Sequence, residues 1–396
     1  MIKKLIQFGA GNIGRSFIGQ VFSRSGFEVV FIDIADTIVD ELNRRGEYRV
    51  IVKRNDKPDE TITVKNVRAV NGKNREEAAA EVAGAAYVST SVGKQALNHI
   101  MPVLAKGLIL RRQETPSLPL DIIIAENLRN GAAFFREELL KNLPPDYPLD
   151  DLAGLVETSI GKMVPIMREE DIRQDPLWVF GEEYNSLIMD RLGFRNPVPE
   201  IIGAHPVDNI KAYVDRKLFI HNLGHAASAY FGFRHDPSWT YIWEPLQEPA
   251  ILRQVREAMT QSALALQREY PADLPMPELE EHIDDLLFRF QNRALGDTIF
   301  RVGRDLMRKL EKSDRIVGAM LLAMKHGLPC DALIGVLKAA LDFRAGDEQG
   351  RMFPGDLAFA EIWHPRGLKE ILTGVSGLDL SVPLEADLLN SITGQK

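Results

Sequence analysis

The sequence predicts an α/β amino-terminal domain built on a parallel sheet, followed by a mostly α-helical carboxy-terminal domain. The first half of the chain alternates short apolar runs with amphipathic segments, which is typical of parallel strands joined by crossover helices. The second half consists of long segments with helical periodicity. Proline-rich sequence over residues 194–208 separates the two patterns, so we expect domains at residues 1–200 and 201–396.

The amino-terminal elements alternate from the start of the chain. We expect a strand at Lys4–Phe8, a helix from Gly11 to Ser25, a strand at Glu28–Asp33 and a helix from Ala35 to Arg45. Two β-rich runs follow, EYRVIV and TITVKNVRAV, which a polar turn separates and which therefore predict an antiparallel excursion.

Two later runs, AAYVSTSVG and LDIIIAEN, pass from apolar to polar residues at their ends. Parallel strands have this pattern where they deliver side chains to a site. In the second half, the apolar period predicts helices at Asn209–Phe231, Ile251–Tyr270, Leu279–Phe290, Asp314–Lys325 and Asp331–Asp342.

Composition excludes several classes of protein. The formal net charge of −8 argues against a broad nucleic-acid footprint, which needs a strongly basic face. The first residues do not form a signal peptide, and no window approaches the roughly 18 apolar residues of a membrane span. Cys330 is the single cysteine, and its apolar surroundings predict a buried structural thiol. We expect a cytoplasmic protein that binds a small molecule and neither nucleic acid nor membrane.

Three glycines at the first strand-to-helix turn, Gly9, Gly11 and Gly14, form the pattern G-x-G-x-x-G. In a Rossmann-type dinucleotide site the first allows a tight turn, the second lets the backbone approach a pyrophosphate, and the third lets the helix pack closely. Asp33 ends the next strand, where a ribose 2′-hydroxyl would bind. Alone, the pattern is also compatible with an ordinary glycine-rich turn.

The carboxylate of Asp33 favours NAD over NADP, because it accepts hydrogen bonds from a diol and repels a 2′-phosphate. The next residues, Ile34 and Ala35, supply no arginine to reverse this preference. The expected cofactor is NAD, and its expected contacts are Gly9, Ala10, Gly11, Asn12, Ile13, Gly14, Asp33, Ser91, Val92 and Gly93.

A second motif lies in the helical half. On an α-helix, Lys217, Asn222 and His225 fall within an arc of about 140°. A lysine can act as a general base if burial or a nearby cation lowers its pKa. The alternative is a solvated lysine on an amphipathic helix. His221 and His225 have the spacing of a helical zinc pair, but the glutamate of H-E-x-x-H and a third ligand are missing, so we expect no metal.

The sequence resembles the family of polyol-specific long-chain dehydrogenases. The resemblance rests on FGAGNIGRSFIG, AENLRNG, the signature K-x-x-x-x-N-x-x-H within residues 208–226, and residues 301–315, which are similar to a stretch of the mannitol-phosphate branch. It implies metal-independent hydride transfer between NAD(H) and a ketose or polyol. It further implies that Lys217 is the general acid/base, that Asn222 and Asn127 polarise the substrate oxygen, and that His225 holds a neighbouring hydroxyl.

The sequence departs from the family at residues 161–165, which read GKMVP where the family has an aspartate-arginine pair. Gly161 removes a carboxylate that could accept from a substrate hydroxyl or tune the lysine. Lys162 either helps to hold an anionic substituent or is an exposed lysine. The identity of the polyol is therefore left open.

Arginines and a lysine after residue 300 offer a phosphate site, because guanidinium groups match phosphate oxygens. Arg301 and Arg304 are expected to share a helical face, with Arg308 and Lys309 nearby, and Arg344 is a weaker candidate. The alternative role of these cations is salt bridging between domains.

Together these features predict an NAD-dependent dehydrogenase that interconverts mannitol 1-phosphate and fructose 6-phosphate. The same residues are compatible with reduction of a hexuronate or oxidation of an unphosphorylated polyol. A hypothesis from another class is an NAD(H)-binding sensor that has lost catalysis.

Overall fold

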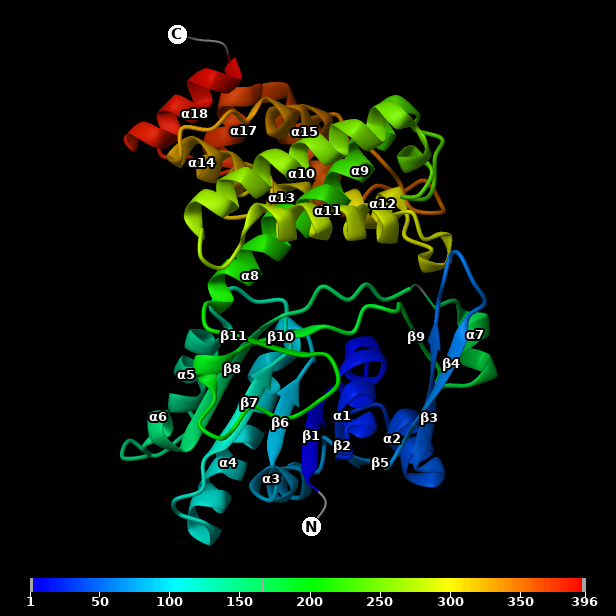
Figure 1. The fold of residues 1–396 in the computed structure, drawn as a ribbon, viewed down its shortest axis with the longest axis vertical. Helices are drawn as coiled ribbons and strands as arrows, with labels where there is room; N and C mark the ends of the chain where they lie inside the picture. Colours follow the sequence, from blue (N-terminus) through cyan, green and yellow to red (C-terminus); the bar gives the residue numbers. More distant parts are fainter. Residues whose placement is uncertain (1–2, 166, 394–396) are drawn as a thin grey trace. The chain divides into compact units, whose positions relative to one another are not determined.

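The computed structural model describes residues 3–165 and 167–393. The chain forms two compact units, Met1–Ile210 and Lys211–Lys396, each of which is described by itself. The first contains the strands and the helices α1–α7, and the second is helical (Figure 1). The predicted α/β and helical halves are thereby confirmed.

The first unit is built on a mainly parallel sheet, which has eight strands within the described residues. Their order across the sheet is β11-β10-β8-β7-β6-β1-β2-β5. The strands are β1 (Lys4–Phe8), β2 (Glu28–Asp33), β5 (Val67–Asn71), β6 (Tyr87–Thr90), β7 (Leu120–Ile124), β8 (Ala153–Ser159), β10 (Leu187–Asp190) and β11 (Ala204–Val207).

Strand β1 lies between β2 and β6, and both pairs are parallel. The chain therefore runs outward from β1 in one direction through β2 and β5, then returns and continues in the other direction through β6, β7 and β8. This reversal is the topological switch point of a dinucleotide-binding sheet, where ligands bind at the carboxyl ends of the strands. Only the pair β8–β10 in this sheet is antiparallel among the described strands.

Apolar side chains cover both faces of this sheet. Leu5 belongs to one core cluster and Ile6 and Phe8 belong to another, so successive side chains of β1 face opposite layers. The helices of this unit are α1 (Gln20–Arg24), α2 (Asp36–Arg45), α3 (Arg75–Ala83), α4 (Leu97–Glu114), α5 (Gly131–Leu140), α6 (Leu149–Leu152) and α7 (Glu169–Gln174).

A second sheet of the first unit has the order β4-β3-β9, with β3 (Glu47–Val52), β4 (Glu60–Lys65) and β9 (Val179–Gly181). Strands β3 and β4 form the predicted antiparallel pair. The β-rich run TITVKNVRAV is not one continuous strand, because Asn66, with a φ of 57°, divides it into β4 and β5. Strand β5 then joins the main sheet parallel to β2.

The segment expected to be a proline-rich connection also differs from the prediction. It contains β11, which pairs in parallel with β10 at the edge of the main sheet. Pro206 lies within this strand. An edge strand tolerates proline because one side of it has no partner strand to receive a backbone N–H.

The second unit consists of helices (Figure 1). They are α8 (Ile210–Arg216), α9 (Leu223–His235), α10 (Pro249–Glu269), α11 (Met276–Phe290), α12 (Ile299–Gly303), α13 (Leu306–Lys309), α14 (Val317–Lys325), α15 (Asp331–Leu341), α16 (Pro354–Ala358), α17 (Leu368–Gly374) and α18 (Pro383–Thr393). The five predicted helical segments all correspond to helices.

Helix α9 is at the centre of the second unit and packs against α10, α12 and α15. A Cβ atom added at Gly224 would lie 2.5 Å from Met259 Sδ, so the glycine permits close approach of α9 to α10. The hydroxyl of the buried Tyr230 donates to the carbonyl of Gly303 at 2.9 Å. Cys330 is buried, as predicted, and burial raises the pKa of its thiol.

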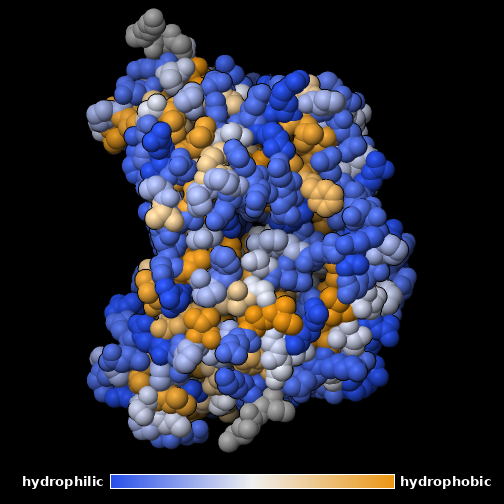
Figure 2. Space-filling model, in the orientation of Figure 1, coloured by the Kyte–Doolittle hydropathy of each residue, from blue (hydrophilic) through white to orange (hydrophobic). Residues whose placement is uncertain are grey.

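Figure 2 shows hydrophilic side chains over most of the visible surface, with smaller apolar patches between them. No helix within residues 3–165 and 167–393 is long and apolar enough to cross a membrane.

Candidate active site

The turn after β1 brings the three motif glycines together. Gly9 has a φ of +91°, and a Cβ atom there would lie 2.6 Å from the carbonyl oxygen of Ser91. A Cβ atom at Gly14 would overlap the carbonyl oxygen of Gly9, whereas one at Gly11 would meet no atom within 4 Å. Two glycines are thus required by the turn itself, while Gly11 faces open space, as expected where a pyrophosphate approaches the backbone.

The helix after this turn begins at Asn12 and contains a π-helical segment, Gly14–Gly19, which leads into α1. The side chain of Arg15, buried in this segment, donates through Nε to the carbonyl of Ala10 at 2.6 Å. The Tyr48 hydroxyl in turn donates to the carbonyl of Arg15 at 2.7 Å. These contacts fix the glycine turn. Neither side chain was predicted from the sequence, because neither belongs to the motif.

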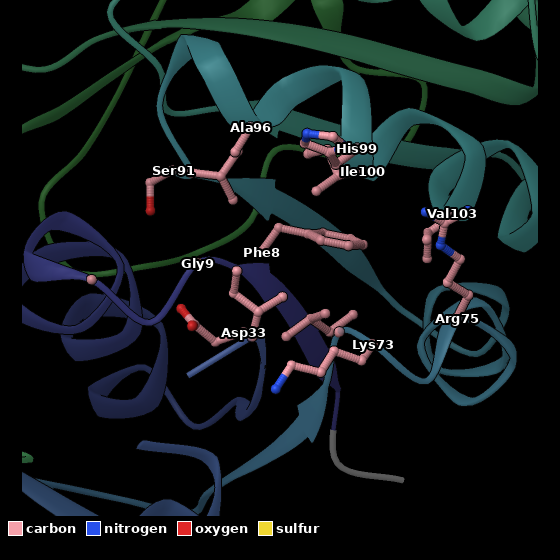
Figure 3. A pocket seen from close by; sticks show the side chains of 15 residues that line it. Phe8, Gly9, Asp33, Lys73, Arg75, Ser91, Ala96, His99, Ile100 and Val103 are labelled. Carbon is pink, nitrogen blue, oxygen red and sulfur yellow. The ribbon is translucent and has the colours of Figure 1, made fainter. Parts of the chain in front are cut away.

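Asp33 ends β2 next to this turn. Its Oδ2 accepts from the N–H of Ala10 at 2.7 Å, and its Oδ1 accepts from the N–H of Ala35 at 3.0 Å. An ionised carboxylate has about four acceptor positions, so the side chain keeps capacity for a diol. Asp33, Gly9 and Gly11 line one pocket of about 680 Å³ (Figure 3).

Both apolar and basic residues line the remainder of this pocket. Its apolar wall suits a flat ring, and Figure 3 shows His99 and Ile100 across from Asp33. Two cations there, Lys73 and Arg75, were not predicted from the sequence. The ammonium of Lys73 pairs with Asp36 at 2.7 Å. The other lining residues are Phe8, Ile32, Ile34, Gly72, Ser91, Val92, Ala96 and Val103.

Of the two motif residues between the glycines, Asn12 is exposed, whereas Ile13 packs on a core cluster of the first unit. Asn12 is therefore the one of the pair whose side chain is accessible to a ligand. Any contact of Ile13 with the cofactor would therefore be made by its backbone atoms.

The turn after β6 lies beside the glycine turn. The N–H of Ser91 donates to the carbonyl of Phe8 at 2.9 Å, and Gln7 Nε2 donates to Ser91 Oγ at 2.9 Å. The next two backbone N–H groups donate to one carboxylate: Val92 to Glu126 Oε1 at 2.8 Å and Gly93 to Glu126 Oε2 at 3.0 Å. Burial raises the pKa of the Glu126 carboxyl above its ordinary value, and the hydrogen bonds that it accepts offset only part of this rise.

Asn127 directly follows Glu126, just beyond the carboxyl end of β7, and is exposed. The structure thus brings the glycine turn, Asp33, the turn Ser91–Gly93 and Asn127 to the carboxyl edge of one sheet. Strands β6 and β7 are parallel, as predicted, so their polar ends lie at the same edge.

In the second unit, the predicted helix over Asn209–Phe231 is interrupted by a π-helical segment, Lys217–Asn222. A π-turn closes between residues i and i+5, and π-segments in α-helices are frequent at functional sites. The five-residue spacing of Lys217 and Asn222 is one such turn. The angle between their side chains around the helix axis is therefore smaller than the arc of about 140° predicted for a regular α-helix.

Lys217 is half-buried. Burial and, to a smaller extent, the nearby cation of Arg315 together lower the pKa of its ammonium to about 8. Arg315 is fixed by ion pairing of its Nε with Asp314 at 2.8 Å, and its Nη1 reaches the carbonyl of Asn222 at 3.4 Å. A lysine with a pKa near neutrality can both give and accept a proton.

His225 lies one turn beyond Asn222. Its ring stacks on Phe290 with a centroid distance of 4.7 Å, and its Nε2 lies 3.2 Å from the buried carboxylate of Asp297. Asp297 also forms an ion pair with Arg301. Burial lowers the pKa of His225 to about 3, with a smaller effect of the Arg301 cation in the same direction. The imidazole is therefore neutral at physiological pH and able to hydrogen-bond to a hydroxyl.

His221, on the same helix, is buried, and burial lowers its pKa well below the ordinary value. The His221 and His225 rings are 6.3 Å apart between centroids. Within the described parts of the chain, no three His, Cys, Asp or Glu side chains form a group suited to a metal ion.

The prediction that Arg301 and Arg304 share a helical face was wrong. Helix α12 ends at Gly303, and Arg304 lies in the short connection to α13, which begins at Leu306. The guanidinium of Arg304 instead lies over the rings of Phe300 and Phe353, at 5.6 and 5.8 Å from their centroids.

Lys309 is buried rather than exposed to a ligand. Its ammonium donates to the carbonyl of Val302 at 2.5 Å and to that of Arg304. These bonds satisfy two of its three N–H groups. Burial lowers the pKa of Lys309 to about 7. Arg308 pairs with Asp305 at 2.6 Å, and Arg344 donates to the carbonyls of Leu341 and Phe343 at 2.8 and 2.7 Å.

The structure contradicts the expectation that Lys162 either holds an anion or is exposed. Its side chain is buried in the first unit and donates to the carbonyls of Glu182 and Tyr184 and to Asn185 Oδ1, at 2.9, 3.0 and 2.7 Å. These three acceptors match its three N–H groups. Lys162 thus stabilises the loop after β9.

Two comparisons with known proteins agree with this architecture. Residues 3–203 match the family model of the mannitol dehydrogenase Rossmann domain, and residues 209–371 match that of the mannitol dehydrogenase C-terminal domain. The two matched segments together span most of the 396 residues.

Solved structures with similar folds include Pseudomonas fluorescens mannitol 2-dehydrogenase, determined as a ternary complex with NAD and D-mannitol. It is 14% identical in sequence, with a TM-score of 0.76 over 100% of this chain and 92% of that chain. Another is 2-dehydropantoate 2-reductase from Geobacter metallireducens GS-15, at 14% identity and a TM-score of 0.51 over 85% of this chain and 98% of that chain. At these identities the similarity shows a common fold.

Proposed function

The chain belongs to the mannitol dehydrogenase family and is an NAD-dependent polyol oxidoreductase, and from this premise we propose that it interconverts mannitol 1-phosphate and fructose 6-phosphate. The observation that carries the proposal is the half-buried Lys217, whose pKa is lowered to about 8, one π-turn from Asn222 and near the cation of Arg315.

The residues of the first unit fit NAD. A Cβ atom at Gly11 would meet no atom within 4 Å, and the adjoining pocket of about 680 Å³ has an apolar wall for the adenine and Asp33 for the ribose diol. The residues proposed to hold NAD are Gly9, Ala10, Gly11, Asn12, Ile13, Gly14, Asp33, Ser91, Val92 and Gly93. Bound NAD(H) supplies or accepts the hydride.

We assign the proton to Lys217. In the reducing direction its ammonium donates a proton to the substrate oxygen, and in the oxidising direction the neutral amine accepts it. The amide groups of Asn222 and Asn127 donate hydrogen bonds to the same oxygen as negative charge develops on it. The neutral ring of His225 holds a neighbouring hydroxyl, and its Nε2 lies 3.2 Å from the carboxylate of Asp297.

The phosphate is assigned to the basic segment of the second unit. Arg301 and Arg304 are exposed, so their guanidinium groups are accessible to a phosphate ester. Lys309 is buried and donates to two backbone carbonyls, so we leave it out of the phosphate site. The ion pair of Arg301 with Asp297 would then connect the phosphate to the histidine that holds a substrate hydroxyl.

A substrate panel tests the proposal. Purified protein should oxidise NADH with fructose 6-phosphate, and much more slowly with fructose or with a hexuronate, because only the phosphorylated ketose engages the arginines. Absorbance of the reduced nicotinamide measures turnover. Turnover with fructose or a hexuronate alone would reject the phosphate while keeping the lysine mechanism, whereas NADH binding without turnover on any substrate would favour the sensor.

Replacement of Asp33 by alanine should weaken NADH binding by about tenfold to hundredfold, because hydrogen bonds to a charged acceptor are lost. The preference for NADH over NADPH should shrink as well, since Lys73 and Arg75 line the same pocket. Titration of nicotinamide fluorescence measures both constants. Asp40→Ala removes an exposed carboxylate from α2 and serves as the control. Unchanged discrimination in Asp33→Ala would mean that another residue binds the ribose.

A further inference from the structure

We infer that Glu126 is a positioning residue that joins the cofactor turn at Ser91–Gly93 to the substrate amide of Asn127, an inference that rests on the proposed function. The carboxylate bridges two loops that follow neighbouring strands, β6 and β7. Both loops supply residues to the proposed site, and Glu126 itself touches neither substrate nor cofactor in this assignment.

The hydrogen bonds of Glu126 are suited to fixing a backbone. Each of its two oxygens accepts from a different N–H, at 2.8 Å from Val92 and 3.0 Å from Gly93. Hydrogen bonds to an ionised acceptor are stronger than those between neutral groups. Gly93 has a φ of 81°, a conformation that the two bonds hold in place.

The same turn is fixed from its other side by β1. Gln7 donates through Nε2 to Ser91 Oγ at 2.9 Å, and the N–H of Ser91 donates to the carbonyl of Phe8 at 2.9 Å. The carbonyl of Ser91 also lies against Gly9, where a Cβ atom would be only 2.6 Å from it. A continuous series of contacts thus leads from the glycine turn through Ser91–Gly93 to Glu126.

The last step of this series is covalent, because Asn127 directly follows Glu126 in the chain. A change in the position of the carboxylate therefore moves both the backbone of Ser91–Gly93 and the start of the segment that presents the amide. Catalytic groups need to be held within a fraction of an ångström of their productive positions.

Glu157 provides a matched control. It is also half-buried, lies on the neighbouring strand β8, and accepts from the backbone N–H of Ala132 at 2.8 Å. Burial raises its pKa in the same way as that of Glu126. Its partner lies in α5 rather than in the cofactor turn, so the two carboxylates differ mainly in which loop they hold.

The test compares Glu126→Gln with Glu157→Gln. A glutamine has one acceptor oxygen, so it can satisfy one of the two N–H groups and presents its own donors to the other. We expect Glu126→Gln to lower kcat with fructose 6-phosphate by about tenfold to hundredfold and to raise the dissociation constant of NADH by about tenfold. Glu157→Gln should change neither constant by more than about twofold.

Thermal unfolding and NADH fluorescence distinguish the outcomes. Equal losses of melting temperature in the two variants, with kinetic constants of the remaining folded protein unchanged in both, would overturn the inference and leave Glu126 with a structural role only. Wild-type protein that binds NADH but reduces none of the ketoses would refute the proposed function. The NADH affinity of Glu126→Gln would still test the connection to the cofactor turn: an unchanged affinity would contradict it.

Discussion

Replacement of Lys217 by alanine is expected to lower kcat on the order of 10²–10⁴-fold in both directions, while the dissociation constant of NADH stays within about twofold of wild type. In the proposed mechanism the amine exchanges a proton with the substrate, whereas the residues proposed to hold the cofactor all lie in the first unit. Steady-state kinetics with mannitol 1-phosphate and fructose 6-phosphate, combined with NADH fluorescence, provide the measurement.

Lys211→Ala is the matched control, because Lys211 is an exposed lysine on α8 of the same helical segment. It should retain wild-type turnover. If Lys217→Ala lost NADH binding but kept its turnover per bound cofactor, the proton-transfer role would be wrong.

The pKa of Lys217, lowered to about 8, also determines the expected pH dependence of the wild type. The reducing direction needs the protonated amine, so its kcat should fall as the pH rises through about 8. The oxidising direction needs the neutral amine, so its kcat should rise over the same range. Neither the fall nor the rise of kcat with pH should occur in Lys217→Ala. If either pH dependence persisted in that variant, it would have to be assigned to another titratable group.

Substitutions at Gly11 and Gly14 should distinguish a side chain that only blocks NADH binding from one that also destabilises the fold. Gly11→Val places a side chain where no protein atom lies within 4 Å, so the melting temperature should change little while NADH affinity falls by about a hundredfold or more. Gly14→Ala forces a Cβ atom against the carbonyl of Gly9. This overlap should cost about 1–3 kcal/mol of stability in addition to the lost NADH affinity.

Gly84→Ala is a suitable control in the same unit, because its Cβ atom would make only an ordinary contact, 3.5 Å from Lys4 Nζ. Differential scanning fluorimetry and NADH titration measure the two effects separately. Normal NADH affinity in Gly11→Val would contradict the assignment of this glycine to the pyrophosphate.

The order of the main elements was predictable from the sequence because local periodicity and the glycine motif specify them. The division of TITVKNVRAV into two strands was not predictable. It depends on the left-handed conformation of Asn66, and the β-rich composition of the run gives no indication of this conformation. The strand β11 was missed for a similar reason: its proline, Pro206, is acceptable only because the strand lies at the edge of the sheet.

Residues of the candidate site could be proposed from the sequence where they belong to motifs, but not where the fold brings distant side chains together. The spacing of Lys217, Asn222 and His225 was visible in the sequence. In contrast, Asp297 beside His225 and Glu126 under the turn at residues 91–93 depend on contacts between segments that are distant in the chain. No spacing rule identifies such pairs.

Cationic side chains were the hardest to interpret from sequence. Lys162 and Lys309 look like surface lysines, yet both are buried and donate to backbone carbonyls. Their long side chains can reach acceptors far along the chain, so charge alone does not show whether a lysine binds a ligand or stabilises a loop.

The π-turn at Lys217–Asn222 has a consequence for comparisons among related sequences. Because this turn uses one residue more than an α-turn, deleting a single residue inside it would restore a regular helix and rotate Lys217 relative to Asn222. Insertions and deletions should therefore be absent between these two positions in relatives that keep the reaction. A gap there would identify a homologue with a different chemistry.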